Sequence, residues 1–122
     1  MDIEQLIKDK MRDIVSLFVI KDYETLKKRY LPEENEIGDF IRALNEYLEF
    51  GEHEGIVSMP PDEEFEKVDI VEITKPTKAL REFSIIFDLW IDGAKSDLTL
   101  DCDAEYYGGE NLKVYLYDLH VL

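Results

Sequence analysis

The sequence predicts an α+β domain in which two or three N-terminal helices pack on one face of a four-stranded antiparallel meander sheet. Apolar residues recur with helical spacing through residues 1–51, and from residue 68 to 122 they alternate with polar residues. The two patterns follow one another without interleaving, which favours helices on one face of an antiparallel sheet. With 122 residues and 45% hydrophobic composition, the chain has the size and apolar content of a single domain.

The first two elements are expected to be helices. Residues 3–20 place their apolar side chains on one stripe, and Asp2 with Gln5 forms a capping box at the start. A second helix is expected to follow Asp22 as its cap. It ends at Leu31, because the residue before a proline avoids the helical region of backbone space.

A third helix is expected from Glu33 or Asn35 to Phe50, although a glycine in its first turns weakens the start. Residues 52–67 then contain glycine, two adjacent prolines and several acidic residues. This composition predicts an acidic surface loop, with one short extended piece at residues 56–59.

The C-terminal part of the chain is expected to form four strands, because its apolar residues recur with a period of two. The expected strands are residues 68–74, 81–91, 96–104 and 112–121. A turn at residues 92–95 joins the second strand to the third as a hairpin. A connection rich in tyrosine and glycine joins the third strand to the fourth.

One register places six residues together on the face of the sheet that points away from the helices. It assumes that the hairpin turn pairs Ile91 with Ser96, and that the next connection keeps Glu105 opposite Leu112. A slip of one residue would move these side chains to the other face. The six residues are Asp88, Trp90, Asp97, Thr99, Asp118 and His120.

In this register Trp90 and His120 both lie beside Asp97, while Asp88 and Asp118 both lie beside Thr99. An Asp–His pair has the arrangement of an orienting carboxylate and a general base. Such a pair is far more often structural, and the chain carries no phosphate-binding loop and no nucleophile motif. We therefore predict no catalytic residue and no enzymatic activity.

No metal or cofactor is expected from the sequence either. The two histidines, His53 and His120, share no ligand spacing. The alternate carboxylates of the third strand lack the turn geometry of a calcium loop. The single cysteine, Cys102, alternates with the apolar residues of its strand, so it is expected to be a small buried hydrophobe.

The formal charge of −15 limits the classes of partner. A chain this acidic is repelled by phosphate backbones and by anionic lipid, so we expect it to bind neither nucleic acid nor membranes. Its acidic start does not resemble a signal peptide, and no apolar run approaches the roughly 20 residues of a membrane span. With a single cysteine as well, the sequence predicts a cytoplasmic protein.

The negative charge is concentrated in the middle of the chain, where residues 31–66 hold twelve acidic residues and one basic residue. Such a run is either a solvated face that keeps the protein soluble or a docking surface for a basic partner. The exposed carboxylates of the third strand raise the same two alternatives, and tyrosines in the following loop are good partner anchors. The candidate partner-binding residues are Glu46, Glu49, Glu52, Glu54, Asp101, Asp103, Tyr106 and Tyr107.

Three short segments resemble a small uncharacterised bacterial domain family with the patterns V-D-L-W, S-D-L-T-L and a closing D-[IL]-H-V-L. They are Phe87–Trp90, Ser96–Leu100 and Asp118–Leu122. The segments Met59–Pro61 and Val71–Ile73 also fit the layout of that family. Its members are similar in size and acidity to immunity proteins encoded beside polymorphic or contact-dependent toxins. The matched polar residues are the same six that the register places on one face.

The resemblance and the charge together imply a non-enzymatic binding protein, an immunity protein that neutralises a cognate toxin, such as a nuclease, by covering its basic surface. One alternative is a small-ligand-binding protein or enzyme that resembles the nuclear-transport-factor-like fold. Its pocket would need polar groups on the core face, where the sequence is apolar. Another alternative is a homodimer formed through the outer face, which would cover Ile86 and Trp90.

Overall fold

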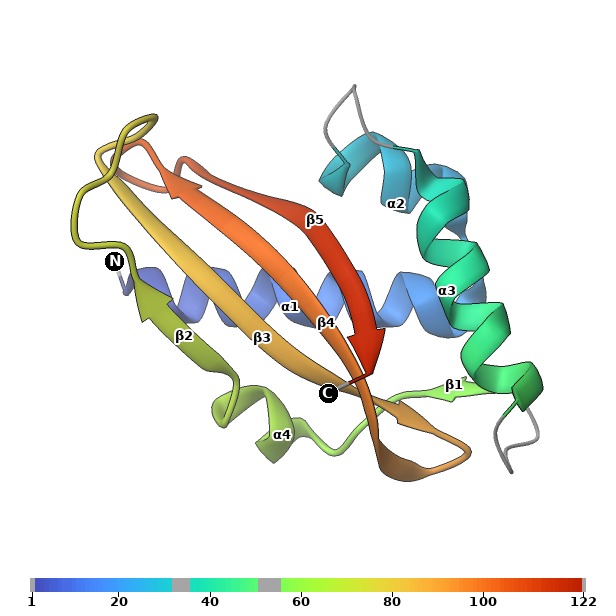
Figure 1. The fold of residues 1–122 in the computed structure, drawn as a ribbon. Coiled ribbons are helices and arrows are strands. Elements are labelled where there is room, and N and C mark those ends of the chain that lie inside the picture. The colour runs from blue at the N-terminus through green and yellow to red at the C-terminus, as the bar shows by residue number, and fades with distance from the viewer. Residues whose placement is uncertain (1, 32–35, 51–55, 122) are drawn as a thin grey trace.

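The computed structural model describes residues 2–31, 36–50 and 56–121, and it confirms the predicted α+β class (Figure 1). Helices come first, and an antiparallel sheet follows. The elements are α1 (Ile3–Ile20), α2 (Tyr23–Tyr30), α3 (Ile37–Phe50), β1 (Val57–Ser58), α4 (Asp62–Glu66), β2 (Asp69–Glu72), β3 (Arg81–Ile91), β4 (Ala94–Tyr106) and β5 (Leu112–Val121).

The sheet contains the predicted meander and one additional short strand. Strands β2, β3, β4 and β5 pair in chain order, and every pairing is antiparallel. Strand β1 pairs with the last two residues of β3, beyond the part of β3 that β2 covers. It lies within residues 56–59, where a short extended piece is predicted.

The segment predicted as an acidic loop over residues 52–67 therefore contains both β1 and the one-turn helix α4. The helix is tied to the core by Phe65, which is fully buried and stacks on Phe87 of β3 with 5.2 Å between ring centroids. Because a single apolar anchor has no period, the sequence pattern gives no sign of this helix. Helix α3 also begins later than predicted, at Ile37.

One face of the sheet is filled by the helices. Figure 1 shows α1 running behind the strands, while α2 and α3 lie beside β5. The core-facing residues of β3 and β4 are nearly inaccessible to solvent. They are Phe83, Ile85, Phe87, Leu89, Ile91, Leu98, Leu100, Cys102 and Ala104. Against them pack the buried residues of α1, including Ile7, Met11, Ile14 and Phe18.

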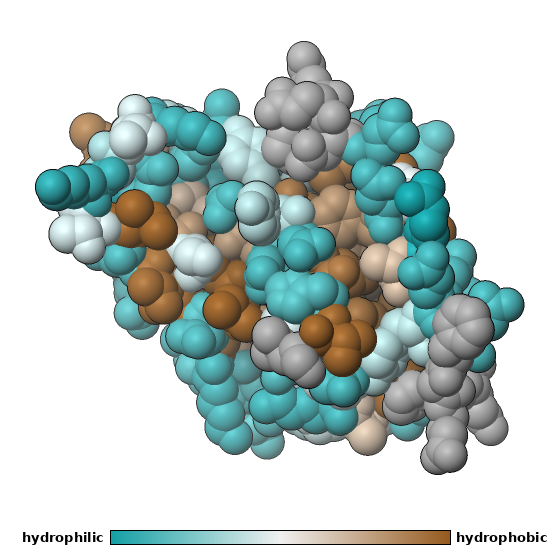
Figure 2. Space-filling view, in the orientation of Figure 1, coloured by the Kyte–Doolittle hydropathy of each residue, from teal (hydrophilic) through white to brown (hydrophobic). Residues whose placement is uncertain are grey.

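None of the helices in the described ranges lies over the opposite face of the sheet, which we call the outer face (Figure 1). Figure 2 shows this side of the molecule, where hydrophilic groups are interspersed with hydrophobic surface over β2 and β3 and between β5 and α3. The residues of the outer face include Ser84, Ile86, Asp88, Trp90, Thr99, Asp101, Asp103, Tyr115, Asp118 and His120.

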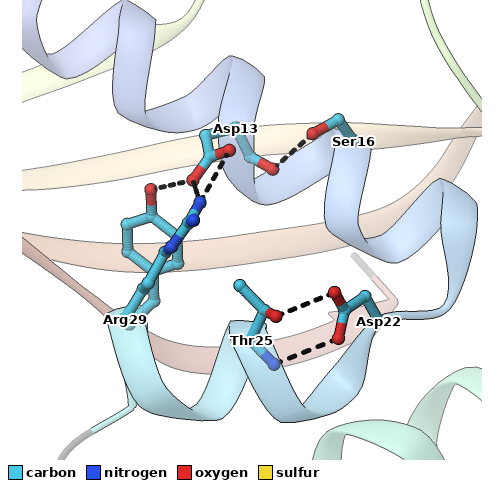
Figure 3. Close-up of polar contacts among 6 residues, drawn as sticks. Asp13, Ser16, Asp22, Thr25 and Arg29 are labelled. Carbon is cyan, nitrogen blue, oxygen red and sulfur yellow. Dashed lines mark hydrogen bonds and ion pairs between the residues drawn. The ribbon is translucent and has the colours of Figure 1, made fainter.

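The junction between α1 and α2 is held by side-chain contacts (Figure 3). Asp22 caps α2, because its carboxylate accepts hydrogen bonds from the backbone N–H of Thr25 at 3.2 Å and from its hydroxyl at 2.8 Å. Asp13 of α1 accepts hydrogen bonds from Arg29 and Tyr30, both on α2. These contacts fix the angle at which the chain turns from the first helix into the second.

The hairpin between β3 and β4 is tighter than predicted. Ile91 pairs with Ala94, so the predicted pairing of Ile91 with Ser96 is wrong. Only Asp92 and Gly93 remain in the turn, and both have a positive φ, 52° and 82°. Two such residues form the type I′ turn that matches the twist of a hairpin, and Asp-Gly is a favoured sequence for it.

An irregularity in the pairing of β3 with β4 restores part of the predicted register. Trp90 lies opposite Lys95, so the predicted pairing of Trp90 with Asp97 is wrong. The pairing then shifts between Asp88 and Trp90, and beyond the shift Asp88 lies opposite Thr99 as predicted. Extra residues in β4 absorb the difference, as in a β-bulge.

The pairing of β4 with β5 also differs from the prediction. Leu112 lies opposite Tyr106, whereas the predicted register pairs it with Glu105. A second irregularity occurs between Asp101 and Cys102. Both differences change which outer-face residues become neighbours, because each shift in register moves a strand along its partner.

Candidate functional site

The second irregularity brings Asp101, Asp118 and His120 together on the outer face. Asp118 lies directly opposite Asp101, and His120 lies opposite Thr99. The predictions that Asp118 faces Thr99 and that His120 faces Asp97 are therefore wrong. We call Asp101, Asp118 and His120 the Asp–Asp–His cluster.

The imidazole of His120 lies between the two carboxylates of this cluster. Its Nδ1 atom is 3.1 Å from Oδ2 of Asp118 and 3.7 Å from Oδ2 of Asp101. One ligand atom from each residue lies within 4.8 Å of the other two. Two carboxylate oxygens and one imidazole nitrogen form a donor set that can hold a metal ion.

Asp101 is the least solvated member of the cluster. Burial raises the pKa of Asp101, His120 opposes this shift, and the neighbouring carboxylate of Asp118 adds to it. Its Oδ1 atom is buried and has no hydrogen-bond partner among the described residues. A buried polar atom without a partner is uncommon in folded proteins and calls for a physical explanation.

The other predicted outer-face residues make contacts of their own. Thr99 is fully buried and donates a hydrogen bond to Asp88 at 2.8 Å, and Asp88 also forms an ion pair with Lys95 at 3.8 Å. Asp97 accepts a hydrogen bond from Tyr47 of α3 at 2.6 Å. Of the six residues predicted to form one patch, the structure joins Asp118 with His120 and Asp88 with Thr99. Asp97 serves to tie α3 to β4.

The predicted partner-binding acids fall on two surfaces. Glu46 and Glu49 are exposed on α3, and Asp101 and Asp103 lie on the outer face of β4. Glu52 and Glu54 lie outside the described residues. The hydrogen bond from Tyr47 to Asp97 joins the helix and the strand that carry these two surfaces.

The predicted tyrosine anchors make contacts at the end of β4 and in the connection that follows it. Tyr106 donates a hydrogen bond to the backbone carbonyl of Gly109 at 2.9 Å. Tyr107 donates one to the carboxylate of Glu105 at 2.5 Å, and this bond raises the pKa of Tyr107 to about 12. The ammonium of Lys113 lies 5.6 Å from the centre of the Tyr107 ring. Both tyrosines therefore stabilise the connection between β4 and β5.

A groove of about 230 Å³ separates α3 from β5 beside the Asp–Asp–His cluster. It is lined by Asp39, Phe40, Ala43, Tyr117, Asp118 and Leu119. Sequence reasoning missed this groove, because its two walls are far apart along the chain. No local pattern relates the residues of α3 to those of β5.

Cys102 is fully buried, and burial raises the pKa of its thiol well above the ordinary value. We expect iodoacetamide to label Cys102 in the native protein only through transient opening, since the thiolate is the reactive form. The rate should rise steeply across the urea unfolding transition. The double variant Cys102→Ala/Ala94→Cys, with its thiol at an exposed position, serves as the control and should react at the rate of a free thiol. Equal native labelling rates for the two proteins would contradict the expected protection.

No helix in the described ranges is long and apolar enough to cross a membrane.

Neither a curated protein nor a solved structure matches the chain. Residues 15–122 match a family of domains of unknown function, DUF7668. Because this match includes α2, α3 and all strands of the sheet as well as the last turns of α1, the chain belongs to the DUF7668 family.

Proposed function

We propose that this chain is a non-enzymatic acidic binding protein, an immunity protein that neutralises a cognate toxin in the cytoplasm by covering the toxin's basic surface. The observation that carries the proposal is the open outer face of the sheet. It presents the carboxylates of Asp88, Asp101, Asp103 and Asp118 on adjacent strands.

Electrostatic complementarity supports a basic partner. Like charges on neighbouring strands destabilise a sheet unless an opposite charge covers them. Lys95 offsets Asp88 and Lys78 partly offsets Asp103, but among the described residues no lysine or arginine forms an ion pair with Asp101 or Asp118. The net charge of −15 would also speed the encounter with a cationic protein, such as a nuclease that must hold phosphate.

Exposed aromatic and apolar side chains on and beside the outer face also support a protein interface there. Tyr117 is 65% exposed beside the groove, and Ile86 is 36% exposed between acidic neighbours. Aromatic and apolar groups within a charged surround are typical of protein interfaces, where a few such side chains supply most of the affinity.

Two alternatives receive less support. A pocket between helices and sheet would need space and polar groups on the core face, but Phe83, Ile85 and Leu100 are at most 5% exposed there. A homodimer through the outer face would set the same carboxylates of two copies against each other, because a two-fold interface brings one patch onto itself. Repulsion between these charges disfavours that assembly.

The test is the affinity for a toxin-like protein encoded beside this gene, measured by calorimetry from about 50 mM to about 200 mM salt. We expect the affinity to fall as salt rises, and Asp103→Lys to lower it at least about 10-fold because it places a cation at the centre of the face. Asp9→Lys is the matched control, since it makes the same charge change on α1 behind the sheet. Equal losses for the two variants, or binding that is insensitive to salt, would rule out this surface.

A further inference from the structure

We propose that Asp101, Asp118 and His120 form a binding site for one divalent transition-metal cation of the Zn²⁺ class. This proposal is independent of the proposed function. Its basis is the placement of three donors on two adjacent strands. Asp118 and His120 are two residues apart on β5, so their side chains lie on the same face, and Asp101 faces them directly from β4.

The distances suit a common ligand. Zinc binds carboxylate oxygens and imidazole nitrogens at about 2.0–2.2 Å, so two ligands of one ion lie at most about 4.4 Å apart. The imidazole Nδ1 is 3.1 Å from one carboxylate and 3.7 Å from the other. The separations around this nitrogen therefore already fall within the range of a metal site.

A second observation also points to a missing partner. Oδ1 of Asp101 is buried without a hydrogen-bond partner among the described residues, although such an atom carries a full desolvation cost. Asp118 places a second carboxylate directly opposite Asp101. Oδ2 of the Asp101 carboxylate lies 3.7 Å from Nδ1 of His120, so a cation bound to both oxygens of Asp101 would satisfy the unpaired oxygen and reduce the repulsion between Asp101 and Asp118.

The donor set selects the class of metal. Imidazole suits zinc, nickel, copper and iron, whereas calcium and magnesium prefer six or more oxygen ligands. Three protein ligands leave at least one coordination position open to water. Because Asp118 is exposed and His120 is about one third exposed, such a water would face solvent on the outer face.

Calorimetric titration of the full chain with ZnCl₂, without an affinity tag, tests the proposal. We expect one equivalent of Zn²⁺ to bind, and Ca²⁺ and Mg²⁺ to bind far more weakly. His120→Gln and Asp118→Asn should each lower the Zn²⁺ affinity by more than the roughly 10- to 100-fold loss typical of an outer-shell partner. The matched controls, Asp9→Asn and Asp62→Asn at exposed positions of α1 and α4, should retain wild-type affinity.

Circular dichroism in EDTA establishes that each variant is folded before metal is added. Zn²⁺ should then raise the thermal midpoint of the wild type and of both controls, but not of His120→Gln. Absence of a saturable one-to-one isotherm in the folded wild type would overturn the proposal, as would undiminished binding by folded His120→Gln. Because no protein partner is used, these outcomes leave the proposed toxin binding untouched.

Discussion

Replacing Phe65 with alanine is expected to lower the free energy of unfolding by about 3–5 kcal/mol, the range for truncating a buried aromatic residue. Phe65 is fully buried and stacks on Phe87, with an interplanar angle of 10°. The guanidinium of Arg12 also lies 4.9 Å from the centre of the Phe65 ring. Alanine would leave a cavity among α1, α4 and β3, and α4 would lose its only buried side chain.

Urea unfolding followed by circular dichroism measures this loss. Glu63→Ala, at an exposed position of the same short helix, is the control and should change the stability by no more than about 0.5 kcal/mol. A loss below about 1 kcal/mol for Phe65→Ala would mean that α4 is not anchored to the sheet as described.

Replacing Asp13 with alanine is expected to cost about 1–3 kcal/mol of stability, because it leaves a buried hydroxyl without its acceptor. Tyr30 is only 4% exposed and donates its hydrogen bond to Asp13. Burial raises the pKa of Tyr30, and the hydrogen bond to Asp13 raises it further. Arg29 also loses its contact with this carboxylate, at 3.0 Å (Figure 3).

A double-mutant cycle separates the hydroxyl contact from the ion pair. Asp13→Ala should cost less in a Tyr30→Phe background, since the orphaned hydroxyl is then absent. Asp9→Ala, an exposed carboxylate on the same helix, is the control for removing a surface charge from α1. Strictly additive effects of Asp13→Ala and Tyr30→Phe would contradict a direct contact between the two side chains.

The helices and the longer strands were predictable because their signals are local. The apolar stripe and the Asp2 cap identify α1 over Ile3–Ile20, and alternation identifies β3 over Arg81–Ile91, as the structure has them. Helix α4 lacked such a signal. This helix forms because Phe65, in an acidic segment, packs against Phe87 of the sheet. That packing is a tertiary contact, which the local sequence does not reveal.

The candidate site was predictable only in part. Alternation along β5 places Asp118 and His120 on one face, since successive side chains of a strand point to opposite sides. Their partners across the sheet depend on register. The tight turn at Asp92 and Gly93 and the two irregularities in pairing determine that register, and the expected turn length placed Asp97 beside the histidine instead.

By itself, then, the sequence determined the order of helices and strands, the face on which the residues of β3 lie and the strong acidity of the chain. These properties depend on residues close together in the chain or on composition alone. Only the tertiary structure decided that His120 meets Asp101, that Asp97 meets Tyr47 and that α3 forms a groove with β5. The physical reason is that turn length and irregularities in pairing set the cross-strand neighbours, and in β5 also the face on which Asp118 and His120 lie, and the local sequence pattern of a strand does not specify them.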